Sequence, residues 1–162
     1  MRQPIAARQP GADPASAEVL YRETFTIRGN DFEHGGEVAT RVKAILRQLG
    51  LPTDAIRRLS IANFEAEMNV IMYAVEATLE LAVLPNAVRI TVADRGPGIP
   101  DIEWAMGEGN STATPEMRAR GFGAGLGLPN IRRNSDEFNI ESAVGVGTRL
   151  SYAVYAGGTA GS

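Results

Sequence analysis

The chain has 162 residues, of which 44% are hydrophobic and 22% are charged, with a formal net charge of -3 and no cysteine. This length and composition suit a single globular domain with a hydrophobic core. Nucleic acid is excluded as the main partner, because a phosphate backbone binds clustered Lys and Arg and the sequence has no such cluster. The lack of cysteine excludes disulfides, thiol catalysis and cysteine-bound metal, and it is compatible with a reducing cytoplasm.

The two ends of the chain differ in composition from the middle. Residues 1–17 are rich in Pro, Ala and Gly and lack the apolar core of a signal peptide, so we expect a disordered arm. Residues 156–162, AGGTAGS, predict a flexible tail. No window approaches the roughly 20 apolar residues that cross a bilayer. We therefore expect a soluble, cytoplasmic protein with no membrane contact, whose domain occupies residues 18–155.

The first predicted elements are a strand and a helix. EVLYRETFTI, residues 18–27, combines β-branched and aromatic residues with partial alternation, which favours a strand. Asp31 is a plausible N-cap for a helix that runs through EVATRVKAILRQL and ends at Gly50. The apolar side chains of this helix share one face. They are Val38, Val42, Ile45, Leu46 and Leu49.

A long second helix is predicted from Thr53, a candidate cap, to Thr78, because no Gly or Pro interrupts this stretch. One face is apolar and further apolar residues widen it, so we expect burial on most sides. The first face consists of Ile56, Leu59, Ala62, Ala66, Val70 and Tyr73. The widening residues are Ile61, Phe64, Met68, Ile71, Met72 and Val75.

The second half predicts two hairpins around a long loop. LELAVL and AVRITVAD are β-type runs joined by Pro85-Asn86, and the second strand ends at Asp94. Residues 95–124 are rich in Gly, Pro, Ser and Thr, with short helical pieces expected near 102–106 and 115–119. A loop this long is usually functional or mobile. LGLPNIRRNSDEF then predicts a helix, and NIESAVGVGTRLSYAVY predicts a hairpin that turns at residues 145–147.

Two polar groups suggest chemistry. Glu65 and Asn69 are four residues apart and project from one face of the second helix, where their oxygens can position a hydrated Mg²⁺ or a water. Asp94, followed by Gly96 and Gly98, ends a strand, and its carboxylate can accept a hydrogen bond from an exocyclic amine such as that of adenine. A solvated helix face and an ordinary tight turn are the alternative interpretations of these two patterns.

Two glycine clusters follow. Gly121, Gly123, Gly125 and Gly127 precede a helix, whose free N–H groups favour phosphate, although a flexible hinge is an alternative. The cluster lacks the Gly-Lys-Ser/Thr of a Walker loop and follows a loop instead of the strand of a Rossmann turn. The second cluster, residues 145–148, ends in Thr148, whose hydroxyl can reach a base or a bridging water, and a plain hairpin turn is the alternative.

Together, these four patterns resemble the GHKL ATPase superfamily, the Bergerat-fold group that includes gyrase, a major heat-shock chaperone family, MutL and histidine kinases. Its motifs E-x-x-x-N, D-x-G-x-G, G-x-G-x-G and G-x-T occur here in that order. The resemblance covers residues 20–155. It implies an α/β (α+β) two-layer sandwich, with helices on one face of a mixed, mostly antiparallel sheet. Mg-ATP would lie between the layers, with residues 95–124 as an ATP lid.

Carried over residue by residue, the resemblance implies that Glu65 is the catalytic base or orienting group and that Asn69 binds Mg²⁺. Asp94 would bind the adenine amine, Gly98 would support the adenine pocket and Thr148 would touch the base side. The other ATP-binding positions would be Gly96, Gly121, Gly123, Gly125 and Gly127, the last three wrapping the phosphates. The lid arginines, which either offset phosphate charge or are solvated, are Arg118 and Arg120.

The branch of the superfamily is indicated by what the chain can accommodate. A sensor histidine kinase needs a phosphoacceptor histidine on a preceding helical hairpin, and the single histidine, His34, is better interpreted as a solvated loop residue. The large transducer domains of gyrase, chaperone and MutL relatives do not fit in 162 residues. The stretch GAGLGLPNIRRNSDEFNIESAVGVGT is similar to anti-sigma-factor serine kinases and RsbT-type switch kinases.

That branch implies a partner protein and three open hypotheses. The first is a serine/threonine kinase that phosphorylates a STAS-domain, anti-anti-sigma-type antagonist. The second is a non-catalytic, nucleotide-gated module that sequesters a sigma factor or activates a phosphatase of the PPM type. The third is an ATPase subunit of another assembly. A homodimer is suggested only by related proteins.

Overall fold

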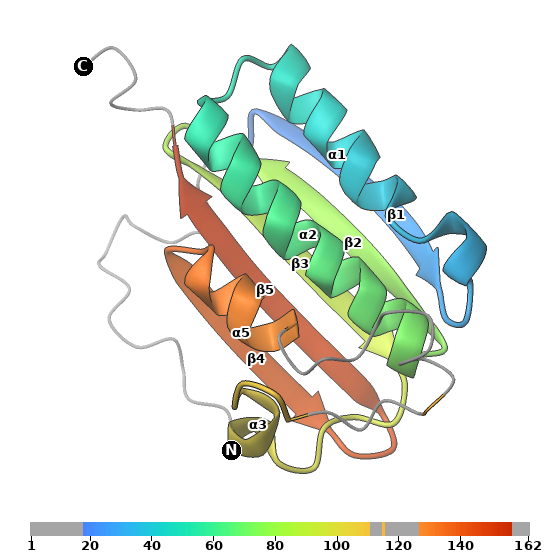
Figure 1. The fold of residues 1–162 in the computed structure, drawn as a ribbon. Coiled ribbons are helices and arrows are strands. Elements are labelled where there is room, and N and C mark those ends of the chain that lie inside the picture. Colours follow the sequence, from blue (N-terminus) through green and yellow to red (C-terminus); the bar gives the residue numbers. More distant parts are fainter. Residues whose placement is uncertain (1–17, 111–114, 116–126, 157–162) are drawn as a thin grey trace.

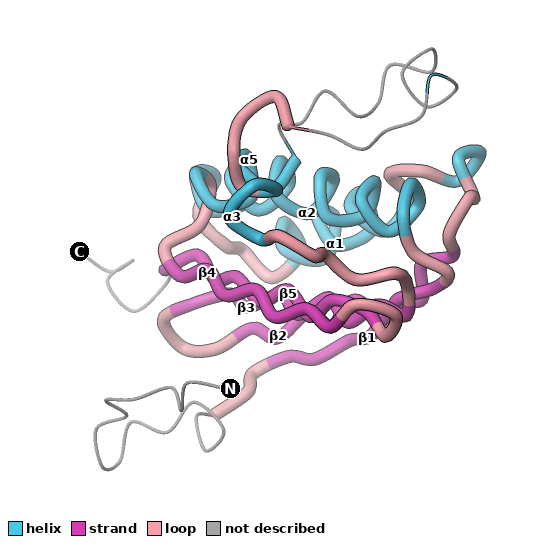
Figure 2. The backbone as a smooth tube through the Cα atoms, turned by 90° about the horizontal axis from the view of Figure 1, so that it is seen from below, coloured by secondary structure: helices cyan, strands magenta, loops and turns pink. Residues whose placement is uncertain are grey.

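The computed structural model describes residues 18–110, 115 and 127–156 of the chain. It has two layers, with helices covering one face of a five-stranded sheet (Figures 1 and 2). The strands are β1 (Tyr21–Arg28), β2 (Glu76–Val83), β3 (Ala87–Arg95), β4 (Glu137–Ala143) and β5 (Gly147–Tyr155). The helices are η1 (Phe32–His34), α1 (Glu37–Gln48), α2 (Thr53–Tyr73), α3 (Ile102–Ala105) and α5 (Gly127–Arg133).

The sheet has the order β1-β2-β3-β5-β4, and every pairing between these strands is antiparallel. The expected sandwich with a mostly antiparallel sheet is therefore confirmed, and the described strands contain no parallel pairing. Alternation along each strand turns one set of side chains toward the helices, as Val88, Ile90 and Val92 of β3 illustrate.

Helix α2 lies over the middle of the sheet, between α1 and α5 (Figure 1). Its inner face is buried as predicted, from Ile56 through Leu59 to Val70. Burial on most sides is confirmed from Glu65 to Tyr73, where Met68 and Ile71 are buried and no residue is exposed. It is wrong around Ile61 and Phe64, which are 37% and 42% exposed. Among the described helices, none is long and apolar enough to cross a membrane.

The predicted end of α2 at Thr78 is also wrong. The helix ends at Tyr73, and Ala74 is already extended, with φ −100° and ψ 167°. From Glu76 onward the chain is β2, with burial alternating as far as Leu81 and with partners in both β1 and β3. The sequence contains no helix-breaking residue here, so pairing with two strands outweighs the local helix propensity.

The start of α1 differs from the prediction as well. Asp31 precedes η1 and makes no capping hydrogen bond, whereas α1 begins after Gly36, which adopts a left-handed φ of 93°. Asp31 instead pairs with the exposed His34, the two side chains lying 2.8 Å apart. The free N–H groups of α1 are satisfied by Glu67 of α2, which is 2% exposed.

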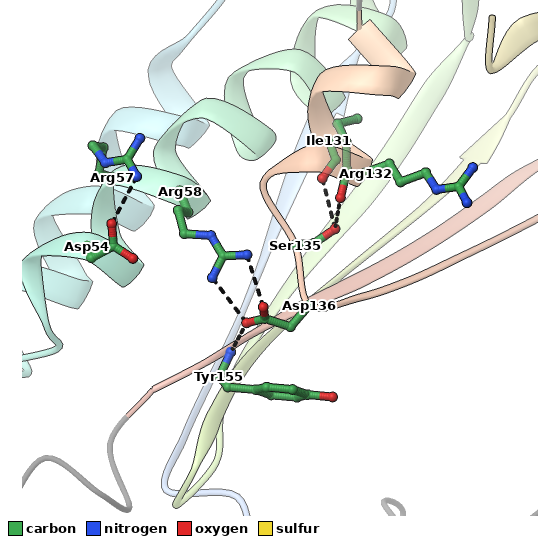
Figure 3. A network of polar contacts seen from close by, with 8 residues as sticks. All are labelled: Asp54, Arg57, Arg58, Ile131, Arg132, Ser135, Asp136 and Tyr155. Carbon is green, nitrogen blue, oxygen red and sulfur yellow. Dashed lines mark hydrogen bonds and ion pairs between the residues drawn. The ribbon is translucent and has the colours of Figure 1, made fainter. Parts of the chain in front are cut away.

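The predicted helix over LGLPNIRRNSDEF is shorter in the structure, since α5 ends at Arg133 and Phe138 belongs to β4. The turn between them is stabilised from α2. Figure 3 shows Arg58 reaching both carboxylate oxygens of Asp136, at 3.2 and 3.0 Å, while the backbone N–H of Tyr155 donates to the same carboxylate at 2.7 Å. One Asp therefore joins α2, the start of β4 and the end of β5.

Candidate active site

A pocket of about 550 Å³ opens between α2, the end of β3 and the beginning of α5. Its volume lies within the usual range for small-molecule sites. The residues that line it come from α2, from β3 and the loop after it, from α5, and from β4 and β5. Among the predicted site residues, Glu65, Asn69, Asp94, Gly98, Gly127 and Thr148 all line this one pocket.

Glu65 and Asn69 project into the pocket from adjacent turns of α2, as their spacing predicts. Gly127, the first residue of α5, lies directly against both. A Cβ atom at Gly127 would be 3.1 Å from Asn69 Oδ1 and 3.3 Å from Glu65 Oε2. The absence of a side chain at Gly127 therefore lets the start of α5 approach the two polar groups closely.

The Glu65 carboxyl is half-buried. Burial raises the pKa of Glu65, and a hydrogen bond from Asn130 opposes that increase. The Asn130 amide nitrogen Nδ2 lies 3.5 Å from Glu65 Oε1, so this bond is long. A carboxylate with a raised pKa accepts a proton more readily near neutral pH, which suits a general base.

Asp94 lies at the other side of the pocket, at the end of β3. Its Oδ1 accepts a hydrogen bond of 3.0 Å from the backbone N–H of Thr148, while burial raises the pKa of the carboxyl. The backbone of β5 can approach Asp94 this closely because residue 147 is glycine. A Cβ atom at Gly147 would lie 2.0 Å from the Asp94 carbonyl oxygen.

The loop after Asp94 is tied to the β4–β5 turn. The N–H of Gly96 donates to the carbonyl of Val146, and the N–H of Gly145 donates to the carbonyl of Pro97. Gly98 has a left-handed φ of 74°, and a Cβ atom there would be 2.4 Å from the Ala143 carbonyl oxygen. Glycine is therefore required at this position on two counts.

Two polar residues near the predicted ones were missed by the sequence analysis. Ser142 accepts a hydrogen bond from the N–H of Ile99, and its hydroxyl lies 2.8 Å from that of Thr148. Asn130 contacts Glu65 from α5. The available signals were weak: Ser142 is two residues from the inward-facing Ile140 and so shares its face of β4, and Asn130 follows Gly127 by nearly one helical turn.

Several predictions fall outside the described residues. These concern Gly121, Gly123, Gly125, Arg118 and Arg120, together with most of the helical piece expected at 115–119. The other helical piece is confirmed as α3, which Asp101 caps by accepting a hydrogen bond from the Trp104 N–H. Trp104 and Ala105 of α3 contribute to the pocket wall.

The donors in the pocket fit a magnesium nucleotide. Asn69 and Glu65 supply the hard oxygen atoms that Mg²⁺ prefers. Within the described ranges, no group of three His, Cys, Asp or Glu side chains could hold a metal ion by itself. A metal here would therefore need phosphate and water oxygens as further ligands, which is the usual arrangement for Mg²⁺. On the Asp94 side, Val92, Ile140 and Leu150 provide apolar surface for a planar base.

Comparison with known proteins gives a consistent result. Residues 30–153 match the HATPase_c_2 family, described as the histidine kinase-like ATPase domain. The chain is 32% identical over 110 residues to serine/threonine-protein kinase RsbT of Bacillus subtilis (strain 168), covering 65% of this chain and 77% of the relative. It is 33% identical over 123 residues to an anti-sigma F factor of Caldanaerobacter subterraneus subsp. tengcongensis, covering 73% and 82%.

Among solved structures, the mycobacterial sensor histidine kinase MprB superposes with a TM-score of 0.51 at 14% identity, over 85% of this chain and 99% of that chain. That likeness concerns the fold alone. The match over residues 30–153 and the two sequence relatives agree with the motifs gathered around the pocket. This chain belongs to the family of histidine kinase-like ATPase domains.

Proposed function

We propose that the chain is an ATP-dependent serine/threonine protein kinase of the anti-sigma regulatory type and that the pocket is its ATP site. One observation carries the proposal: Glu65, Asn69, Asp94 and Thr148 line a single pocket of about 550 Å³. The names of the relatives, serine/threonine-protein kinase RsbT and anti-sigma F factor, support this class of protein.

In this proposal the base of ATP binds on the Asp94 side. The Thr148 N–H donates a hydrogen bond to Asp94 Oδ1 and so orients the carboxylate toward the pocket. There the carboxylate accepts a hydrogen bond from the exocyclic amine of adenine. Apolar side chains enclose the ring, namely Val92, Ile140 and Leu150. Gly98 keeps the loop close to β4 on this side of the pocket.

The phosphates then extend toward α2 and α5. Asn69 Oδ1 is the proposed ligand of Mg²⁺, and Gly127, with Gly121, Gly123 and Gly125, is proposed to surround the phosphates with backbone N–H groups. When bound, Mg²⁺ supplies positive charge that offsets the negative charge of the phosphoryl oxygens. The close approach of Gly127 to Asn69 keeps the start of α5 beside this position.

Glu65 orients the acceptor hydroxyl and takes its proton. The oxygen of a partner serine or threonine bonds to the γ-phosphorus, the bond from that phosphorus to the bridging oxygen of ADP breaks, and the hydroxyl proton moves to the Glu65 carboxylate. Burial of Glu65 supports this role, because it raises the pKa of the carboxyl. The proposed partner is a STAS-domain antagonist of the anti-anti-sigma type.

A second candidate function, sequestration of a sigma factor, is favoured by the relatives named anti-sigma F factor. Activation of a PPM-type phosphatase belongs to the same non-catalytic class. Glu65→Ala separates the two functions. Loss of phosphoryl transfer together with retained partner binding would indicate that both functions are present, whereas a variant that retains full regulation would favour binding alone.

Calorimetric titration with ATP, with and without Mg²⁺, tests the site directly. We expect the native chain to bind ATP in a Mg²⁺-dependent way. Asp94→Asn should lose most of this affinity, because a neutral amide accepts a hydrogen bond from the adenine amine less strongly than a charged carboxylate does. Asp54→Asn is the matched control, since Asp54 is an exposed carboxylate paired with Arg57. No binding by the native chain would refute the ATP site.

A further inference from the structure

Three side chains outside the motifs connect Glu65 to the segment after α3. Asn130 Nδ2 lies 3.5 Å from Glu65 Oε1. The Asn130 carbonyl oxygen Oδ1 accepts a hydrogen bond of 2.6 Å from Arg133 Nη2. The other terminal nitrogen of Arg133, Nη1, forms an ion pair with Glu108. The connection therefore runs from Glu65 of α2, through two residues of α5, to Glu108 in the segment after α3.

The chemistry of the two outer groups fixes the direction of the Asn130 amide. A guanidinium can only donate, so the amide must turn its oxygen toward Arg133. A carboxylate can only accept, so the amide must turn its NH₂ group toward Glu65. The orientation of the amide is thus determined by both neighbours, which removes the usual ambiguity between amide oxygen and nitrogen.

The two oxygens of Glu65 consequently have different neighbours. Oε1 faces the amide of Asn130, whereas Oε2 is the oxygen next to Gly127, where a Cβ atom would come within 3.3 Å. The same glycine position is next to Asn69 Oδ1. Oε2 is therefore the oxygen on the side of the proposed metal and phosphate groups.

We propose that Asn130 is a positioning residue, which holds Glu65 through Oε1 and leaves Oε2 to receive the proton of the acceptor hydroxyl. Arg133 and Glu108 act through it, by keeping the amide turned toward Glu65. The inference deepens the proposed kinase function and rests on it for the role of Glu65. The contact between Asn130 and Glu65 can be tested without nucleotide and without a partner protein.

The first test measures that contact in the full chain by NMR with ¹⁵N labelling. The side-chain amide signals of Asn130 are identified by their loss in Asn130→Ala. We expect them to shift on Glu65→Ala and on Arg133→Ala, while the amide of Asn139, on the exposed side of β4, stays in place. Unmoved Asn130 signals in a folded Glu65→Ala variant would overturn the inference.

The second test measures function as single-turnover loss of the γ-phosphoryl group from ATP, with water as the acceptor. Asn130→Ala and Asn130→Asp should each slow this step by about tenfold through misplacement of Glu65. Asp keeps the shape of Asn and can still pair with Arg133, but it has no N–H for Glu65. Asn130→Asp also places a second carboxylate beside Glu65, whereas Asn130→Ala removes the N–H without adding charge. An unchanged rate in Asn130→Asp would contradict the proposal.

Two further measurements are the rate of the Glu65→Ala, Asn130→Ala double variant and the ATP affinity of Asn130→Ala. In the Glu65→Ala background, Asn130→Ala should cause no further loss of rate, because residues that act as one unit are not additive. The affinity for ATP should stay within about twofold in Asn130→Ala, since the change affects the chemical step and not ground-state binding. Asn139→Ala serves as a matched amide deletion that leaves rate and affinity unchanged.

These tests separate the two proposals. A native chain that binds no ATP refutes the kinase function, and the NMR measurement still decides whether Asn130 holds Glu65. A native chain that turns over ATP and tolerates Asn130→Asp keeps the kinase function and rejects the positioning role.

Discussion

Glu65 and Glu67 are two residues apart on α2, and the helix turns them toward opposite surroundings. Glu67 points to α1 and is 2% exposed. Its two oxygens accept hydrogen bonds from the backbone N–H groups of Gly36, Val38 and Ala39, at 3.0, 3.2 and 2.8 Å. Glu65 points to the pocket, and Asn130 offers it one hydrogen bond of 3.5 Å.

Burial raises the pKa of both carboxyls, but the hydrogen bonds that lower the pKa again differ between them. Three backbone donors lower the pKa of Glu67 against the effect of burial, whereas a single side-chain amide does so at Glu65. Glu67 caps a helix that has no cap of its own, so its interactions stabilise the fold. Among the described residues only Asn130 donates to Glu65, so its carboxylate keeps acceptor capacity on the pocket side, which is what a proton acceptor needs. The two roles differ because residues two positions apart on a helix point to nearly opposite sides.

The largest effect is expected from Glu67→Ala. The substitution leaves buried N–H groups at the start of α1 without their acceptor and removes an anion from the positive end of that helix, which should cost ~3 kcal/mol of unfolding free energy. Urea denaturation measures this loss. Glu65→Ala is the matched control and should change stability much less, because Glu65 is half-buried and makes one long hydrogen bond. Equal losses in the two variants would remove the distinction.

A smaller effect is expected at Asp136, which tests whether a partly exposed carboxylate behaves like Glu67. The hydrogen bonds from Arg58 lower the pKa of Asp136. A pKa lowered by folding adds stability at pH values above the unfolded value of about 3.9, and this stability is lost as the pH falls through the folded value. The side chains of Arg58 and Asp136 are 21% and 26% exposed, so the contribution should stay below about 1 kcal/mol.

Asp136→Asn should therefore make the native chain less stable at neutral pH and flatten the loss of stability below about pH 4. Urea titrations at a series of pH values give the two curves. Curves that stay parallel through the acid range would mean that Asp136 does not contribute to the pH dependence.

The smallest effect on stability is expected from Gly127→Ala, at the pocket. Alanine favours a helix, so the free energy of unfolding should change by less than about 1 kcal/mol. The new methyl group would nevertheless lie 3.1 Å from Asn69 Oδ1 and 3.3 Å from Glu65 Oε2. We expect Mg²⁺-dependent ATP affinity to fall by about tenfold as these side chains are displaced, measured by calorimetry beside a melting curve. Unchanged affinity in a folded variant would mean that Gly127 tolerates a side chain beside the bound nucleotide.

The sequence predicted much of the fold and six of the residues that line the pocket. Glu65, Asn69, Asp94, Gly98, Gly127 and Thr148 line the pocket because local spacing and strand ends place them there. The two-layer arrangement and the mostly antiparallel sheet followed from the resemblance and are confirmed, whereas the order of the strands was not predicted. The roles assigned to the individual site residues remain predictions.

What the sequence could not indicate depends on contacts between distant segments. Glu67 appears as one more polar residue in a helix, and its donors lie 28 to 31 residues earlier in the chain. The end of α2 at Tyr73 is set by pairing of β2 with two other strands. Asn130 has no local pattern that points to Glu65, because their contact spans 65 residues. Long-range packing decided each of these cases.

The hydrogen bond from Thr148 to Asp94 bridges 54 residues and has a consequence for how the protein is made. The loop after β3 receives its support from the β4–β5 turn, through Val146 and Gly145. A growing polypeptide that has completed β3 therefore has the Asp94 carboxylate but not the wall that holds it. Contacts of such sequence separation form late in folding. Any ligand that needs this corner of the pocket can be held only once β5 has emerged and paired, so ligand capture reports that the β4–β5 hairpin is in place.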